Sequence, residues 1–111
     1  MIDKLSEIAL LLDFYGNLLT DKQRMVMSYY YDEDMSLGEI SEELEISRQA
    51  VYDLIKRSEK MLREYEAKLG LVKRFLEQKE KLLLIKQHLL SKNTNENISD
   101  VVDLIDEIIN M

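Results

Sequence analysis

The sequence predicts an all-α protein, and three observations support that prediction. The chain of 111 residues contains no proline and three glycines, which is too few turn residues for a series of strands. Hydrophobic residues recur along most of the chain at spacings of three and four, the period of an amphipathic helix. They also make up 46% of the composition, which is typical of a globular protein and not of a disordered one.

Six helices are expected from the hydrophobic period and from residues that begin helices. Thr20 with Gln23, and Ser36 with Glu39, form capping boxes, in which each side chain satisfies a backbone N–H of the other residue. Ser47 is the expected N-cap of the following helix. The predicted helices are, in chain order, 2–15, 20–30, 36–44, 47–69, 71–90 and 99–109.

The connections between these helices follow from their turn residues. Gly16 is expected to end the first helix in the left-handed conformation, and the fourth helix is expected to end before Gly70. The acidic turn 32–34 ends the second helix. The polar segment 91–97 is predicted to be a flexible linker, after which Ser99 caps the last helix.

The chain is expected to have two parts. Residues 1–69 are predicted to form a helix-turn-helix DNA-binding domain, and residues 70–111 a C-terminal helical extension for packing or dimerisation. The apolar run 82–85 widens the stripe of its helix to nearly half of the surface, which suggests contacts on two sides. A short last helix is marginal alone in water, so it is expected to dock on its own domain or on a partner subunit.

The helix-turn-helix motif is assigned to about residues 36–57. Such a motif needs two helices with inward aliphatic side chains, a tight turn between them, and an outer face that is free for a DNA groove. Ala50 is small where the two helices must approach each other. The predicted inner residues are Ile40, Leu44, Ile46, Val51 and Ile55.

The outer face of the second helix carries residue types that suit DNA. Arg48 fits a bidentate contact to guanine, and Gln49 a bidentate contact to adenine. Tyr52 fits a sugar or a thymine methyl group. The full set of predicted DNA-binding residues is Ser47, Arg48, Gln49, Tyr52, Asp53, Lys56, Arg57 and Lys60.

The other outer residues are expected to contact phosphates. Lys56, Arg57 and Lys60 supply positive charge, and Ser47 with the helix N-terminus can hold a further phosphate. Asp53 fits only if it accepts from a cytosine amine or orients Arg57. The alternative is that all of these are ordinary exposed helix residues.

The charge of the chain is divided into blocks. The net charge is -7, but residues 1–46 carry -8, residues 47–92 carry +6 and residues 93–111 carry -5. The basic block begins at the predicted recognition helix. Because a phosphate backbone responds to a local patch, this distribution is compatible with nucleic acid.

Residues 19–62 resemble region 4 of the sigma-70 family, whose pattern runs from Leu-Thr through Gln-Arg and a tyrosine to a helix-turn-helix. The whole chain resembles the bacterial YlxM family, whose members are encoded beside the signal-recognition-particle GTPase. That resemblance implies a regulatory role in the signal-recognition-particle pathway. The residues that match the sigma-70 pattern are Leu19, Thr20, Gln23, Arg24, Leu37, Glu39, Ile40, Leu44, Ile46, Ser47, Val51 and Lys56.

Two residues of the motif depart from the sigma-70 pattern. Ser41 stands where alanine is usual, and Glu45 stands where glycine is usual. A turn residue with positive φ is uncommon for a glutamate, so the turn is expected to differ at Glu45. Acidic Glu42 and Glu43 also lie beside the predicted DNA face.

Catalysis, cofactors and metals are not expected. The chain has no cysteine, which excludes thiol chemistry, and its only histidine, His88, lies in a leucine-rich helix. The acidic turn 32–34 lacks the glycine and the spacing of a calcium loop. The chain has no apolar run long enough for a membrane span and no export leader, which favours the cytoplasm.

Three functions remain open. DNA binding is preferred, a protein adaptor of RNA polymerase or of the secretion machinery is the main alternative, and RNA binding is a third. A homodimer is also expected, because residues 61–90 carry excess apolar surface and two-fold proteins usually pair DNA half-sites. The sequence does not choose between activation and repression, and it identifies no DNA site.

Overall fold

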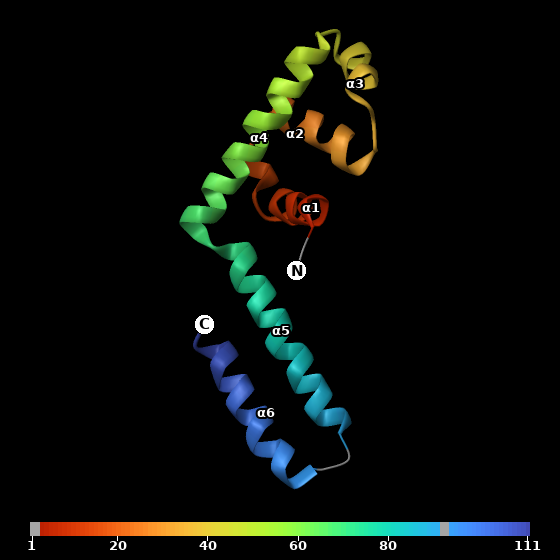
Figure 1. Cartoon of the computed structure of the whole chain (residues 1–111). Coiled ribbons are helices and arrows are strands. Elements are labelled where there is room, and N and C mark those ends of the chain that lie inside the picture. Colours follow the sequence, from red (N-terminus) through yellow and green to blue (C-terminus); the bar gives the residue numbers. More distant parts are fainter. Residues whose placement is uncertain (1–2, 92–93) are drawn as a thin grey trace. The chain divides into compact units, whose positions relative to one another are not determined.

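The computed structural model describes residues 3–91 and 94–111, without the side chains of 94–97. This part of the chain contains six α-helices and no strand, so the all-α prediction is confirmed (Figure 1). The chain divides into two compact units, Met1–Gly70 and Leu71–Met111. The helices are α1 (Lys4–Tyr15), α2 (Asp21–Met27), α3 (Leu37–Leu44), α4 (Arg48–Leu69), α5 (Leu71–Leu90) and α6 (Thr94–Ile109).

The predicted caps of the helix-turn-helix region are confirmed. In both capping boxes the side chain and the backbone bond reciprocally, with Gln23 N–H 3.2 Å from the Thr20 hydroxyl oxygen and Glu39 N–H 3.1 Å from that of Ser36. The Ser47 hydroxyl accepts from the backbone N–H of Ala50 at 3.0 Å and so begins α4. At the other end of the first unit, Gly70 caps α4 in the left-handed conformation, with φ 62°.

The start of the first helix differs from the prediction, and so does its end. Ile2, its predicted start, lies outside the described residues, and α1 begins after Asp3, whose carboxylate accepts from Ser6 N–H at 2.8 Å. Gly16 has φ -55° and ψ -34°, so the predicted left-handed stop is wrong. The backbone instead tightens into the 3₁₀ turn Gly16–Leu18, closed by a bond from Leu19 N–H to the Gly16 carbonyl.

The second helix ends earlier than its hydrophobic period suggested. α2 stops at Met27 and gives way to a wider π turn, Ser28–Asp32, which Glu33 N–H closes on the Ser28 carbonyl. This turn contains the three consecutive tyrosines. A π turn shifts the register of side chains around the helix axis, and it directs the hydroxyl of Tyr31 to a buried carboxylate on α4.

The last helix begins earlier than predicted. α6 starts at Thr94, so Ser99 lies inside the helix and is not its cap. The predicted linker 91–97 is therefore wrong for 94–97, while residues 92–93 lie outside the described part. Neither proline nor glycine occurs between Thr94 and Ser99, so the strongest helix breakers are absent from that stretch.

The core of the first unit is built on one stripe of α4. Helices α1, α2 and α3 all pack against α4, which runs along the unit in Figure 1. Each fully buried residue at the centre contributes about 1.5 to 3 kcal/mol when it is removed from water. The largest fully buried apolar side chains are Ile8, Leu11, Tyr15, Val26, Met27, Ile40, Val51 and Leu62.

The buried stripe also contains a charged residue. Glu59 is only 5% exposed. Its carboxylate accepts from the Tyr31 hydroxyl at 2.9 Å and lies 3.6 Å from Lys4 Nζ and 3.7 Å from Lys56 Nζ. Burial, and then the hydrogen bond to Glu59, raises the pKa of the Tyr31 hydroxyl well above its ordinary value. The cluster ties α1 and the π turn to α4.

The turn of the helix-turn-helix is closed by the two residues that depart from the sigma-70 pattern. Glu45 adopts the left-handed conformation directly, with φ 56° and ψ 43°. The Ser41 hydroxyl donates to the Ile46 carbonyl at 2.5 Å, and Ile46 N–H donates to the Ser41 carbonyl at 3.2 Å. An alanine at 41 has no hydroxyl to make the first bond, so Ser41 supports the left-handed Glu45.

The second unit is an antiparallel hairpin of α5 and α6. Lys81 Nζ lies 2.6 Å from Glu107 Oε2, and His88 Nε2 lies 3.8 Å from Asp100 Oδ2. Residue numbers thus rise along one helix as they fall along the other. Ile85 is buried between these two pairs. Among the described residues, no helix has both the length and the apolar character needed to cross a membrane.

The substitution Tyr31→Phe is expected to lower the free energy of unfolding by about 1 to 3 kcal/mol, because it removes a hydrogen bond from a buried carboxylate. Urea unfolding followed by circular dichroism measures the change. Tyr30→Phe is the matched control, since Tyr30 is 37% exposed and its edge contact with the Tyr31 ring needs no hydroxyl. Equal losses in the two variants would contradict a specific role for the Tyr31 hydroxyl.

Glu45→Gly is expected to be more stable than Glu45→Ala by about 0.5 to 1 kcal/mol. A left-handed residue with a Cβ costs roughly 1 to 2 kcal/mol, and the greater freedom of glycine in the unfolded chain offsets part of that gain. Both variants remove the same charge, so their difference in urea midpoint reports the backbone alone. An alanine variant as stable as the glycine variant would be inconsistent with a left-handed residue 45.

Candidate nucleic-acid interface

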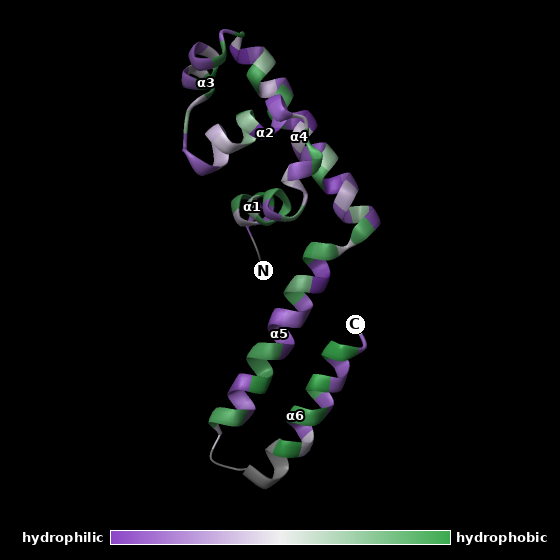
Figure 2. Cartoon of the chain, turned by 180° about the vertical axis from the view of Figure 1, so that it is seen from behind, coloured by the Kyte–Doolittle hydropathy of each residue, from purple (hydrophilic) through white to green (hydrophobic). Residues whose placement is uncertain are grey.

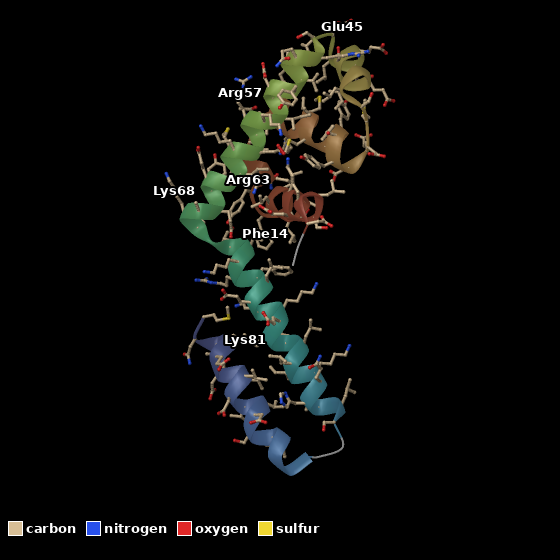
Figure 3. All side chains as sticks on the ribbon, in the orientation of Figure 1. Phe14, Glu45, Arg57, Arg63, Lys68 and Lys81 are labelled. Atoms are coloured by element: carbon tan, nitrogen blue, oxygen red, sulfur yellow. The ribbon has the colours of Figure 1, made fainter. Side chains whose placement is uncertain are left out.

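The predicted DNA-binding residues are brought together on the outer face of α4. The opposite face of this helix carries the buried stripe, so the core fixes which side chains point outwards. Figure 3 places Glu45 at the tip between α3 and α4, and Arg57, Arg63 and Lys68 along α4. All eight predicted residues from Ser47 to Lys60 are exposed.

Arg48 does not extend freely from the helix. Its guanidinium lies over Gly38 of α3, where a methyl group on Gly38 would come within 3.1 Å of Arg48 Nη2. A glycine at this position therefore lets the arginine lie flat against the first helix of the motif. To reach a guanine edge, Arg48 has to leave this position by rotating about its side-chain bonds.

Asp53 organises its neighbours differently from the prediction. Its carboxylate accepts from Gln49 Nε2 at 3.0 Å, one helical turn away. Arg57 approaches the Asp53 backbone carbonyl, at 3.5 Å from its Nε, and not the carboxylate. The amide of Gln49 is thus held in one orientation along the helix surface.

Tyr52 and Lys56 form a second cluster on this face. Lys56 Nζ lies 5.5 Å from the centre of the Tyr52 ring, within the range of a cation–π interaction. The same ammonium group lies 3.7 Å from the buried carboxylate of Glu59. Tyr52 is 45% exposed, so its ring is open to a ligand on one side.

A shallow basic depression continues from this cluster along α4. Its lining includes Lys56, Lys60 and Arg63 of α4 and Lys4 of α1. Arg63 is paired with Glu7, whereas no salt bridge involves Lys60 among the described residues. Lys4 and Arg63 are not among the residues predicted from the sequence. The helical period places Arg63 on the same face as Lys56 and could have identified it, but Lys4 reaches this face only through the packing of α1.

The exposed surface of α3 is acidic. Glu39, Glu42, Glu43 and Glu45 are all exposed on this helix or at its end. Hydrogen bonds with Ser36 hold the pKa of Glu39 below its ordinary value, so this carboxylate is ionised at neutral pH. The positive face of α4 therefore borders a negative one, and a polyanion has to approach along α4.

Among residues 3–91 and 98–111, no cluster of three or more His, Cys, Asp or Glu side chains could hold a metal ion. His88, the only histidine of the chain, lies on α5 in the second unit.

Comparison with known proteins identifies the family of this chain. A family model described as "Putative helix-turn-helix protein, YlxM / p13 like", with the family name UPF0122, matches residues 2–102. A UPF0122 protein of Bacillus mycoides (strain KBAB4) is 49% identical over 109 residues, which cover 97% of this chain and 99% of that protein. UPF0122 proteins of Bacillus cereus (strain AH187) and Bacillus anthracis (strain A0248) are each 48% identical with the same coverage. The chain belongs to the UPF0122 family of YlxM / p13-like helix-turn-helix proteins.

Proposed function

We propose that this protein is a non-catalytic, DNA-binding regulator whose recognition element is the N-terminal half of α4. The observation that carries the proposal is the outer face of α4, where polar and basic side chains are exposed opposite the buried stripe. The major groove of DNA is wide enough for one helix in this orientation. The family description as a helix-turn-helix protein supports binding at the level of class.

The contacts on α4 fall into two groups by position. Arg48 and Gln49 lie in its first turn, where the recognition helix of this motif meets base edges. Lys56, Arg57 and Lys60 lie about two to three turns further on and carry the charge for phosphates. We propose Tyr52, between the groups, as a contact to sugar or to a thymine methyl group.

The finer features of the proposal come from the resemblances. A docking mode like that of sigma-70 region 4, and regulation of the signal-recognition-particle pathway, are proposed on that basis. A homodimer is proposed because two copies would pair two half-sites about one turn of DNA apart. RNA polymerase and components of the signal recognition particle are the proposed protein partners.

A protein adaptor is the second candidate, and the acidic α3 favours it. Four exposed carboxylates beside the recognition helix oppose a phosphate backbone and suit a basic protein surface. A genome-wide map of the DNA sites bound by the protein distinguishes the two candidates. A map with reproducible sites supports the regulator, and an empty map supports the adaptor.

The double substitution Arg48→Ala with Gln49→Ala is expected to weaken binding to a duplex taken from the strongest mapped site by roughly 10- to 100-fold or more. Each bidentate base contact contributes about 1 to 3 kcal/mol of discrimination. Fluorescence anisotropy at fixed salt measures the affinity. Arg74→Ala with Gln87→Ala is the matched control, because it makes the same chemical change at two exposed positions of α5. Binding as tight as that of the control would show that α4 does not read the bases.

Lys60→Gln is expected to weaken binding to matched and unmatched duplexes alike. Removing one phosphate contact should reduce the slope of log affinity against log salt by about 1. Titrations at several salt concentrations measure that slope. Lys22→Gln on α2 is the control for charge, since its position is exposed but lies outside the α4 face. An unchanged slope for Lys60→Gln would remove this residue from the interface.

A further inference from the structure

Helix α6 has two hydrophobic seams, and α5 covers only one of them. The inner seam is half-buried against α5 and consists of Val101, Leu104, Ile108 and Met111. The outer seam has the spacing four, three, four, which is that of the contact positions in paired helices. Its residues are exposed by 65%, 49%, 42% and 71%, in the order Ile98, Val102, Ile105 and Ile109.

Helix α5 contributes to the same exposed surface. Leu82 and Leu89, seven residues apart, are 56% and 70% exposed and flank the buried Ile85. Each residue advances about 100° around the helix axis. Leu82 and Leu89 are therefore displaced from Ile85 in the same direction around α5, and the outer seam of α6 is displaced from the inner seam in that direction too. Because α5 and α6 are antiparallel, this common sense of rotation turns both rows to one side of the hairpin.

Hydrophobic colouring recurs along both helices of this hairpin (Figure 2). The hairpin surface formed by Leu82, Leu89 and the outer seam of α6 is hereafter called the hairpin face. Monomeric proteins seldom expose a continuous apolar surface of this kind without a use for it.

The two edges of the hairpin face have opposite charge. On the α5 edge the helical period places Lys79 and Lys86 beside the leucines. On the α6 edge it places Asp106 beside the outer seam. No salt bridge involves these three residues in the described part of the chain, since Lys81–Glu107 and His88–Asp100 are the pairs that join α5 and α6.

We propose that the hairpin face is covered by the hairpin face of a second copy of this chain, with a two-fold axis parallel to the helices. This axis places α5 of each copy over α6 of the other and forms an antiparallel four-helix bundle. Each leucine row of α5 then packs on the outer seam of the partner's α6. The bundle geometry is that of common four-helix proteins.

The edge charges select this arrangement over its alternative. The pairs Lys81–Glu107 and His88–Asp100 show which residues of α5 and α6 lie at the same level along the hairpin. At matching levels, Lys79 and Lys86 of one copy lie on either side of Asp106 on the acidic edge of the other copy. An axis perpendicular to the helices would instead place lysine edge on lysine edge and acidic edge on acidic edge, which is unfavourable.

The inference rests on the homodimer of the proposed function and names its surface. It is tested without nucleic acid, so its outcome is independent of whether α4 binds DNA. If the bundle is absent while α4 still binds its duplex, only the dimer is wrong. If the bundle forms and no duplex binds, only the DNA-binding proposal is wrong.

Leu82→Glu and its neighbour Leu83→Glu form a matched pair for this test. Leu83 is 50% exposed, close to the 56% of Leu82, but the helical period directs it away from the hairpin face. By sedimentation equilibrium at micromolar concentration, we expect the parent and Leu83→Glu to be dimers of the 13.1 kDa chain and Leu82→Glu to be a monomer. Circular dichroism shows whether each variant keeps its helix content. A monomeric parent, or equal association of the two variants, would overturn the proposal.

Charge reversal tests the arrangement of the two copies. Lys79→Glu with Lys86→Glu is expected to weaken dimerisation roughly tenfold or more, because acidic edges then face each other. Adding Asp106→Lys to the same chain should restore part of the affinity. With the perpendicular axis, the first pair of changes would replace one like-charge contact by another, and the affinity would stay the same. That result would refute the proposed arrangement.

Discussion

The first unit depends on one constraint, which is that three helices bury their apolar faces on a single stripe of α4. Val51, Ile55 and Leu62 lie in that stripe and fix the rotation of α4 about its own axis. Once that rotation is fixed, the opposite arc of the helix has to face solvent, and this arc carries the basic and polar side chains. The packing of the core therefore also determines which side chains α4 presents on the candidate DNA face. α4 continues for 22 residues, so the same stripe supports the motif and anchors α1.

A charge inside the stripe adds specificity to this packing. Burying Glu59 among aliphatic residues is unfavourable unless its oxygens have partners, and a buried ion pair is a weak source of stability. The partners come from three different elements, namely Lys4 of α1, Tyr31 of the π turn and Lys56 of α4 itself. An alternative packing of α1 or of the π turn would leave the Glu59 carboxylate in an apolar core without these partners. Lys56 links this cluster to the outer face, because its ammonium group lies between Glu59 and the Tyr52 ring.

Local chemistry explains which features could be predicted from sequence. The capping boxes at Thr20 and Ser36 and the left-handed Gly70 each depend on residues within one turn, and the structure has all three. Gly16 carries the same local signal as Gly70, yet a 3₁₀ turn at the core replaces the left-handed stop. The position of Arg48 over α3 also depends on tertiary packing, which no local pattern encodes. The chain could thus be divided into helices from its sequence, whereas the orientation of the site residues required the packed structure.

The separation of charge along the chain has consequences for both proposed surfaces. A net charge of -7 opposes a polyanion at long range, so the proposed DNA binding by α4 would depend on its local basic patch. Affinity would then come from short-range contacts of α4, and sequence-independent binding should be weak. In the second unit the same separation would act between copies, because the basic edge of α5 faces the acidic edge of the other copy's α6 only when the two-fold axis is parallel to the helices. Two copies joined in this way would carry two α4 helices in one molecule, and a second contact made by the same molecule would compensate for the weak long-range attraction of each copy alone.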